Sequence, residues 1–179
     1  INSMHAMEIS YVVTIQEQTP AWLERALSIY TECIHPSSAF SIVAPFLFGL
    51  TRRGLAMQLV VVSCSNDMVN LLLKWCAAGD RPYWASSDIR QFPITCEGGF
   101  GMPSGHVQAF TALTYFILLR LDARWWWYSV QTVMVMIGSY SRVLTGSHFP
   151  SQTLAGWLVG LLCGIGGHRI LAFPNVKTT

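Results

Sequence analysis

Charge is scarce in this sequence of 179 residues. Asp, Glu, Lys and Arg together make up 11% of it, whereas about 25% is usual in a soluble domain. A soluble domain of this length would need more charged side chains to cover its surface, so the composition favours a membrane protein. The net charge of +2, without any run of Lys and Arg, argues against binding to nucleic acid.

Patterns for metal ions, disulfide bonds and secretion are missing as well. The five cysteines form no Cys-x-x-Cys pair, which argues against both a zinc site and a disulfide framework. No paired carboxylates or clusters of His and Asp suggest a metal site, so we expect neither a metal nor a cofactor. The N-terminal stretch lacks the basic flank and apolar core of a cleavable signal peptide, and we expect none.

Apolar residues make up 52% of the chain and gather in five segments. The segments are residues 28–50, 55–73, 106–121, 125–144 and 153–172. Each approaches the roughly 20 residues that a helix needs to cross a bilayer, where it satisfies its own main-chain hydrogen bonds. With a mean hydropathy of +0.41, the sequence predicts an all-α integral membrane bundle of about five transmembrane helices.

The last apolar segment carries glycine at every fourth position, at Gly156, Gly160 and Gly164. On a helix these residues lie on one face and have no side chain to hold a neighbouring helix away. We predict that another helix of the chain packs closely there. This would be ordinary tight packing rather than a dimer interface.

The distribution of cations predicts how the bundle is oriented. If successive helices alternate in direction, one membrane face receives Arg52, Arg53, Arg120, Arg124, Arg169 and Lys177, offset only by Asp122. The positive-inside rule makes that face cytoplasmic. We therefore predict a non-cytoplasmic segment over 1–27, a membrane-embedded domain over 28–172 and a cytoplasmic tail over 173–179. The loop over 74–104 and the loop around His148 then lie together on the non-cytoplasmic side.

Three permanent cations stand out among the few charges of this chain. Lys74 and Arg81 flank the start of the long polar loop, and Arg142 lies near the end of the fourth apolar segment. The guanidinium group of arginine is a planar fork that binds two phosphate oxygens at once, whereas the ammonium group of lysine is a point charge. Each could be an ordinary charge at a membrane surface, but their combination favours phosphate binding.

The tetrapeptide over 103–106, Pro-Ser-Gly-His, lies where the polar loop enters the third apolar segment. Ser104 is a natural N-cap residue, and the free N–H groups of a first helical turn form an anion site. Gly105 lacks a side chain that would obstruct an oxyanion, and His106 projects from the first turn. The motif therefore suits the binding of an anion beside an imidazole.

His106 and His148 can divide the chemistry of phosphoryl transfer between them. The ordinary pKa of histidine, about 6.5, allows one imidazole to act as a neutral nucleophile and the other as a protonated acid. The cations and the N-terminal dipole of a helix would neutralise charge on the phosphoryl group, in place of magnesium. We assign no function to the remaining histidines, His5, His35 and His168.

In this order, the motifs resemble the type 2 phosphatidic acid phosphatase superfamily, whose pattern is Lys-x6-Arg-Pro, Pro-Ser-Gly-His and Ser-Arg-x5-His-x3-Asp. Within it, the chain is most similar to the glucose-6-phosphatase catalytic subunits. The segments that carry this similarity are KWCAAGDRPYW from Lys74, QFPITCE from Gln91, GMPSGH from Gly101 and HFPSQ from His148. The resemblance covers most of residues 38–170.

The resemblance implies a role for each matching residue. It makes His148 the nucleophile that forms a phosphohistidine, and His106 the acid that protonates the departing sugar oxygen. The phosphate-binding residues would be Lys74, Arg81, Ser104, Gly105 and Arg142. It further implies hydrolysis of glucose 6-phosphate, the final step of gluconeogenesis and glycogenolysis, at a lumenal site in the endoplasmic reticulum membrane. There the chain would contact membrane lipids and receive its substrate from a separate glucose 6-phosphate transporter.

Two departures from the superfamily pattern affect this interpretation. Gln152 replaces the Asp of the pattern, as in the glucose-6-phosphatase branch, and its side-chain carbonyl could accept a hydrogen bond from the imidazole of His148. Similar enzymes also continue through further helices, so we expect a C-terminally truncated bundle. A lipid phosphate phosphatase of the same superfamily and an inactive membrane protein with a binding role are the alternative functions.

Overall fold

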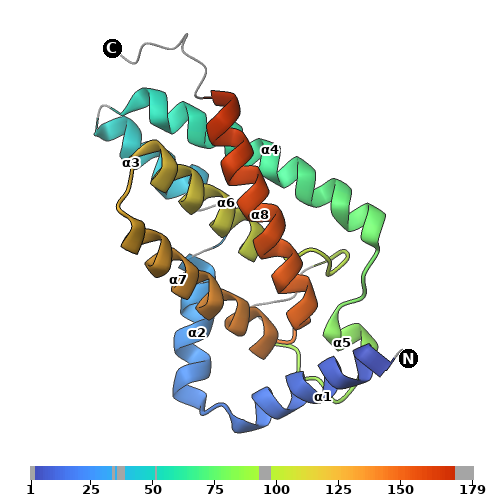
Figure 1. The fold of residues 1–179 in the computed structure, drawn as a ribbon. Helices are drawn as coiled ribbons and strands as arrows, with labels where there is room; N and C mark the ends of the chain where they lie inside the picture. Colours follow the sequence, from blue (N-terminus) through green and yellow to red (C-terminus); the bar gives the residue numbers. More distant parts are fainter. Residues whose placement is uncertain (1–2, 34, 36–38, 51, 93–97, 172–179) are drawn as a thin grey trace.

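A computed structural model describes residues 3–33, 35, 39–50, 52–92 and 98–171 (Figure 1). Within these ranges the secondary structure is helical throughout, as predicted. The elements are α1 (Ser3–Gln18), α2 (Ala21–Cys33), the π-helix η1 (Ala39–Val43), α3 (Ala44–Gly49), α4 (Arg53–Ala77), α5 (Pro82–Ala85), α6 (Gly105–Arg120), α7 (Trp125–Leu144) and α8 (Pro150–Leu171). The predicted tail over 173–179 lies outside the described residues.

The last four apolar segments each form one long helix, namely α4, α6, α7 and α8. Among the described residues, two helical stretches, Arg53–Ala85 and Pro150–Leu171, are long and apolar enough to cross a membrane. The outer face of α8 stays apolar, since Leu154, Leu158 and Leu162 are all more than half exposed. Exposed leucines in a row suit a helix that is surrounded by lipid.

The prediction of one continuous helix over 28–50 is wrong. α2 ends at Cys33, and the chain from Ala39 to Gly49 forms η1 followed by α3. Pro45 lies in the first turn of α3, where its missing N–H removes no helical hydrogen bond. Since η1 leads directly into α3, the predicted helix is divided between the end of α2 at Cys33 and the start of η1 at Ala39.

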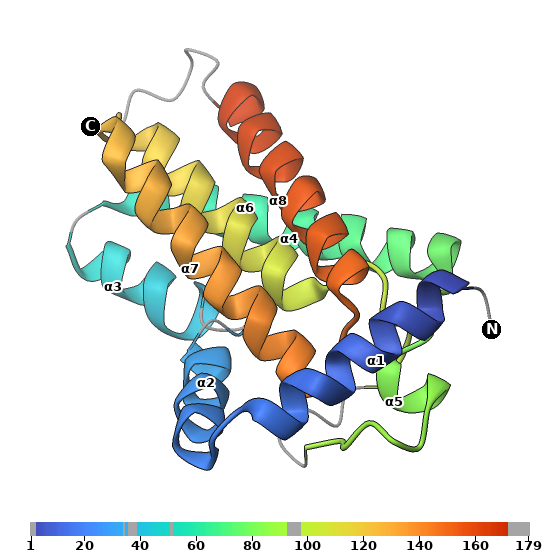
Figure 2. The ribbon, with the colours of Figure 1, turned by 60° about the horizontal axis from the view of Figure 1, so that its bottom comes forward.

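The polar N-terminal segment contains a helix that the sequence pattern did not indicate. Val12 and Ile15 of α1 are buried with Val143 and Leu144 of α7 and with Phe149. Full burial of a large apolar side chain stabilises a fold by about 1.5–3 kcal/mol. As Figure 2 shows, α1 therefore lies across the end of α7, beside α5.

The predicted close packing on the glycines of α8 is confirmed, and the neighbour is α6. A Cβ atom at Gly156, Gly160 or Gly164 would lie 2.6, 2.5 or 2.7 Å from the main-chain carbonyl oxygen of Ser104, Gln108 or Ala112, respectively. Such distances leave no room for any side chain, so glycine alone allows this approach. The contact fixes the start of α8 against the start of α6.

Four helix ends meet at one end of the bundle. The C-terminal ends of α4 and α7 and the N-terminal ends of α6 and α8 lie together there, while their other ends point away (Figures 1 and 2). The three motifs singled out in the sequence all lie at or next to these four helix ends. The alternation of helix direction predicted from the apolar segments therefore brings the motifs to a common region.

Candidate active site

Two arginines are almost fully enclosed at this end of the bundle. Arg81 and Arg142 are 0% and 1% exposed. Arg81 directly precedes α5, where Pro82 fixes the first helical turn. Its Nε donates a hydrogen bond to the carbonyl oxygen of Gly99 at 2.8 Å, and its Nη1 donates to that of Ser147 at 3.3 Å. The Arg81 side chain therefore links the loop before α6 to the loop before α8.

The start of α6 presents unused hydrogen-bond donors. Ser104 is the N-cap residue, as predicted, with extended dihedral angles of φ −66° and ψ 115°. Its side chain makes no capping bond, and its buried Oγ has no hydrogen-bond partner among the described residues. A Cβ at Gly105 would lie 3.2 Å from Asn70 Oδ1, so this position is also crowded. The Ser104 hydroxyl and the first-turn N–H groups are therefore donors of the kind that bind anions at helix N-termini.

His148, in the loop between α7 and α8, is fully buried and held in one orientation. Its Nδ1 lies 2.8 Å from the carbonyl oxygen of Gly101. Because a carbonyl only accepts hydrogen bonds, Nδ1 carries the proton and Nε2 presents its lone pair. That Nε2 atom is buried and has no partner in the part of the chain that the structure describes. The imidazole thus offers a directed, unprotonated nitrogen.

The surroundings of His148 keep its ring neutral. Burial is the largest cause, and the positive charges of Arg142, Arg81, Lys74 and His106 add to it, so the pKa of His148 is well below its usual value. These four side chains are close enough to act on one imidazole, although they come from α4, α6, α7 and the loop before α5. The structure therefore brings together the histidines and cations that the sequence singled out.

His106, the second residue of α6, is 6% exposed. The ring of His35 lies edge-on to it, with 4.8 Å between the ring centroids. The sequence alone assigns no function to His35, because 71 positions separate it from His106 and only the fold brings the two rings together. Among the described residues, no group of three or more His, Cys, Asp and Glu side chains could hold a metal ion.

The comparison with protein families agrees with this geometry. The model of the PAP2 superfamily matches residues 55–174, which include all three motifs. The chain belongs to the PAP2 superfamily.

Among curated proteins, similar sequences are glucose-6-phosphatases. "Glucose-6-phosphatase 3" of Bos taurus is 31% identical over 178 residues, which is 87% of this chain and 51% of that relative. The Homo sapiens protein of the same name is 31% identical, over 80% of this chain and 47% of the relative. "Glucose-6-phosphatase catalytic subunit 1" of Haplochromis nubilus is 32% identical, over 70% of this chain and 43% of the relative. The chain thus spans about half the length of the curated relatives it matches.

A solved PAP2 structure has the same fold. It is the crystal structure of a transmembrane PAP2-type phosphatidylglycerolphosphate phosphatase from Bacillus subtilis, with a TM-score of 0.76. The match covers 99% of this chain and 90% of the other at 18% identity. The all-α membrane bundle predicted from the apolar segments is therefore the PAP2 fold.

One prediction about the PAP2 motifs is wrong: Gln152 does not bond to the imidazole. Its Oε1 accepts from the N–H of Phe149 at 3.2 Å, and its Nε2 donates to the carbonyl oxygen of Asp80 at 2.7 Å. Its own main-chain carbonyl accepts from the N–H of Ser104 at 3.0 Å. The imidazole of His148 bonds to the carbonyl oxygen of Gly101 instead. The hydrogen bonds of Gln152 connect the loops that contain Asp80, Ser104 and Phe149.

Gly101 lies in the site through main-chain hydrogen bonds, which the sequence pattern did not indicate. Its N–H donates to the carbonyl oxygen of Gly79 at 2.7 Å, while its own carbonyl accepts from the imidazole of His148. A Cβ at this position would lie 2.7 Å from Gln152 Oε1 and 3.1 Å from the carbonyl oxygen of Asp80. A side chain at position 101 would therefore have to displace the amide group of Gln152.

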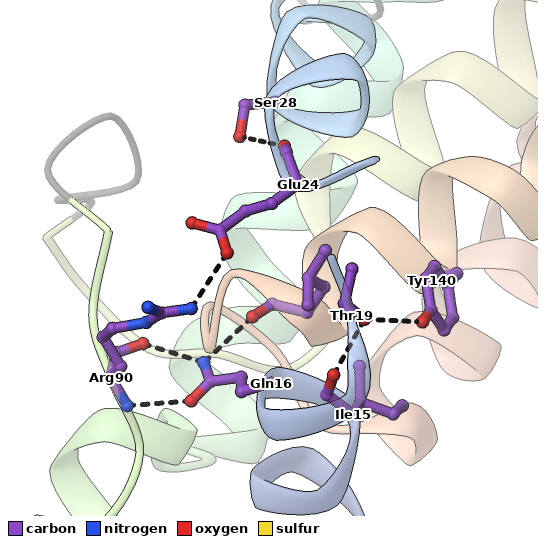
Figure 3. A network of polar contacts seen from close by, with 8 residues as sticks. Ile15, Gln16, Thr19, Glu24, Ser28, Arg90 and Tyr140 are labelled. Carbon is purple, nitrogen blue, oxygen red and sulfur yellow. Dashed lines mark hydrogen bonds and ion pairs between the residues drawn. The ribbon is translucent and has the colours of Figure 1, made fainter. Parts of the chain in front are cut away.

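A polar network behind the PAP2 motifs fixes the loop after α5 (Figure 3). Gln16 of α1 donates to the carbonyl oxygens of Arg90 and Leu144 at 2.8 and 2.9 Å and accepts from the N–H of Arg90 at 2.9 Å. The Arg90 side chain in turn pairs with Glu24 at 2.9 Å. Two residues of the N-terminal segment thereby hold the loop and the end of α7, which sequence patterns alone did not reveal.

Ser141 has a structural position although it belongs to the Ser-Arg motif. Its hydroxyl is fully buried, donates to the carbonyl oxygen of Leu27 at 2.9 Å and shares a hydrogen bond with the hydroxyl of Thr31. Both partners belong to α2. Ser141 thus anchors α7 to α2 one residue before Arg142.

Proposed function

We propose that this chain carries the active site of a membrane phosphohydrolase that converts glucose 6-phosphate and water to glucose and phosphate through a phosphohistidine. The observation that carries the proposal is a buried, neutral imidazole with an unpartnered nitrogen, surrounded by the charges of Lys74, Arg81, Arg142 and His106. Such a group of cations suits a phosphate, and the free nitrogen suits an attack on phosphorus.

The reaction runs in two steps that return the site to its starting state. Nε2 of His148 attacks phosphorus, the bond from phosphorus to the sugar oxygen breaks, and protonated His106 gives its proton to that oxygen. Water then attacks the phosphoryl group while His106 takes up a proton. The bond from phosphorus to Nε2 breaks, its electron pair returns to the ring, and phosphate leaves.

In this mechanism each anion-binding group has a defined task. Arg81, Arg142 and Lys74 neutralise the phosphoryl oxygens, and Arg142 is the basic residue in the last turn of α7. The hydroxyl of Ser104 and the N–H of Gly105 donate to an oxygen that gains charge in the transition state. No step requires these groups to change protonation, so they act as fixed positive charges and donors.

The carbonyl of Gly101 takes over the orienting task of the Asp in the superfamily pattern. A carbonyl accepts the Nδ1 proton and fixes the ring as a carboxylate does, but it carries no full negative charge to stabilise a positive ring. Gln152 holds this arrangement in place through its hydrogen bonds to Phe149, Asp80 and Ser104. Gln152 is thus a positioning residue for the nucleophile.

Glucose 6-phosphate is favoured as the substrate because the curated relatives at 30–32% identity are named glucose-6-phosphatases. A lipid phosphate is the second candidate, since the solved PAP2 relative is named a phosphatidylglycerolphosphate phosphatase. By the same argument from relatives and from the positive-inside rule, the active site faces the lumen of the endoplasmic reticulum. A separate transporter would then deliver the sugar phosphate.

A phosphate-release assay on the chain in membranes tests the proposal. Glucose 6-phosphate and phosphatidic acid are offered separately, with His148→Ala as the control for background hydrolysis. We expect His148-dependent release that is faster from the sugar phosphate. Faster release from phosphatidic acid would establish the second candidate. Binding of vanadate without release from either substrate would instead indicate an inactive binding protein.

A further inference from the structure

A cavity of about 480 Å³ lies beside the imidazole of His106. Its walls come from α4, from the chain over 98–100, from the start of α6 and from His35. Lys74 and His106, which the proposed mechanism uses, both line it. Because His106 gives its proton to the leaving group in the proposed mechanism, the leaving group would lie in this cavity.

The wall contributed by α4 contains a carboxylate. Asp67, Asn70, Leu71 and Lys74 line the cavity at helical positions i, i+3, i+4 and i+7, which form one face of the helix. Asp67 is the single Asp or Glu within α4, α6, α7 and α8. Ionisable side chains inside membrane helices are unfavourable and mark functional positions. The proposed mechanism does not use this carboxylate.

Asp67 and Lys74 mark opposite ends of the cavity wall. Seven residues separate them, which is about 10 Å along a helix. Nδ2 of the neighbouring Asn66 donates a hydrogen bond to Oδ1 of Asp67 at 3.4 Å. A phosphate bound near Lys74 is thus kept away from the repelling carboxylate, while the rest of the substrate extends toward it.

The chemistry of a carboxylate decides which leaving group fits. An ionised Asp only accepts hydrogen bonds, so its natural partners are hydroxyl donors. An acyl chain placed there would remove water from the carboxylate without replacing its hydrogen bonds, which is unfavourable. The neighbouring wall is aromatic, since Trp75 and Phe100 lie edge to face with 5.8 Å between their ring centroids. Apolar walls with one directed polar group are typical of a small-molecule site.

We propose that Asp67 determines substrate specificity by accepting hydrogen bonds from the hydroxyl groups of a sugar leaving group. The inference rests on the proposed phosphohydrolase function, and it assigns the substrate class to a particular side chain. Under it the site selects phosphate esters of polyhydroxylated alcohols over phosphate esters that lack hydroxyl groups.

The test compares two substrates on one variant, Asp67→Asn, which keeps the shape of the side chain. kcat/KM is measured for glucose 6-phosphate and for 4-nitrophenyl phosphate, whose leaving group has no further hydroxyl. We expect a loss of about 10- to 100-fold for the sugar phosphate, as for a lost hydrogen bond to a charged group, and less than about twofold for the nitrophenyl ester. Because both values come from one sample, their ratio does not depend on the fraction folded.

Met68→Leu is the matched control, because Met68 is the next residue of α4 and is 59% exposed. It should leave both values unchanged. Equal losses for both substrates with Asp67→Asn, or no loss for either, would overturn the role of Asp67 while leaving the phosphohydrolase intact. If the wild-type chain released phosphate from neither substrate, the proposed function itself would fail, and the inference with it.

Discussion

Arginine occurs at both ends of the helical bundle, but in opposite surroundings. At the end where the motifs meet, Arg81 and Arg142 are buried. At the other end, Arg52, Arg124 and Arg169 are exposed. An uncompensated buried charge is strongly unfavourable, whereas an exposed arginine at a membrane surface has little cost. Burial thus distinguishes the arginines for which we propose phosphate binding from those for which we predict a role in membrane orientation.

Replacing one arginine at each end of the bundle should give the largest difference in activity between the two ends. We expect Arg142→Ala to lower kcat/KM for phosphate release by about 10²- to 10³-fold, since a fixed charge on the transition state is lost. Arg124→Ala should retain activity within about twofold. Arg142→Lys keeps the charge but loses the planar fork, so its rate should fall between these values. Similar losses from Arg142→Ala and Arg124→Ala would contradict the distinction between the two ends.

Replacing Gln152 tests whether activity at the buried end depends on main-chain geometry as well as on charge. Gln152→Ala removes the bonds that hold the loops of Asp80 and Phe149, so kcat should fall by about 10- to 100-fold. The KM should change little, because no phosphate-binding cation is removed. Ser151→Ala, an exposed neighbour on α8, is the control. A raised KM with unchanged kcat would show that Gln152 acts on binding instead.

Two faces of α8 also differ in how closely they are packed. A Cβ at Gly160 would lie 2.5 Å from a carbonyl oxygen of α6, whereas a Cβ at Gly166 would meet nothing within 4 Å. Gly160→Ala should therefore lower the free energy of unfolding by about 1–3 kcal/mol. Gly166→Ala should leave it unchanged or raise it, because alanine favours helices. Thermal unfolding in detergent compares the two, and an equal effect would argue against the close contact of α6 with α8.

The smallest expected effect concerns pH. Because burial and the surrounding cations lower the pKa of His148, the unfolded chain binds a proton below about pH 6.5 that the folded chain does not bind. As the pH is lowered from about 6.5, the free energy of unfolding should thus decrease by up to about 1.4 kcal/mol per pH unit, until the lowered pKa of His148 is reached. The His148→Gln variant has no imidazole at this position to bind the proton, so its free energy of unfolding should decrease less steeply as the pH is lowered. Parallel curves of unfolding temperature against pH would mean that His148 is not held neutral.

Much of the buried end could be predicted from the sequence. Lys74, Arg81, His106, Arg142 and His148 lie in short motifs next to apolar segments, and alternation of the helices sends these motifs to one end. The long apolar segments located α4, α6, α7 and α8. Apolar runs and motif spacing are local signals, which is why they were sufficient here.

The parts that were missed depend on contacts between distant segments. α1 has no clear apolar period, yet it covers the end of α7. His35 reaches His106 only through the fold, and the hydrogen bond to His148 comes from a main-chain carbonyl that any residue at position 101 would possess. For the same reason, the side chain of Gln152 was assigned the wrong partner. Main-chain contacts leave no signature in the identity of the residue.

Trapping of the phosphorylated protein tests the central claim most directly. The chain in membranes is incubated with glucose 6-phosphate labelled on phosphorus, quenched with denaturant, and the labelled residue is mapped. We expect label on His148 in the wild type, none in His148→Ala, and persistent label without turnover in His106→Ala. Undiminished labelling of His148→Ala would contradict the account, because the buried imidazole would then not be the group that attacks phosphorus.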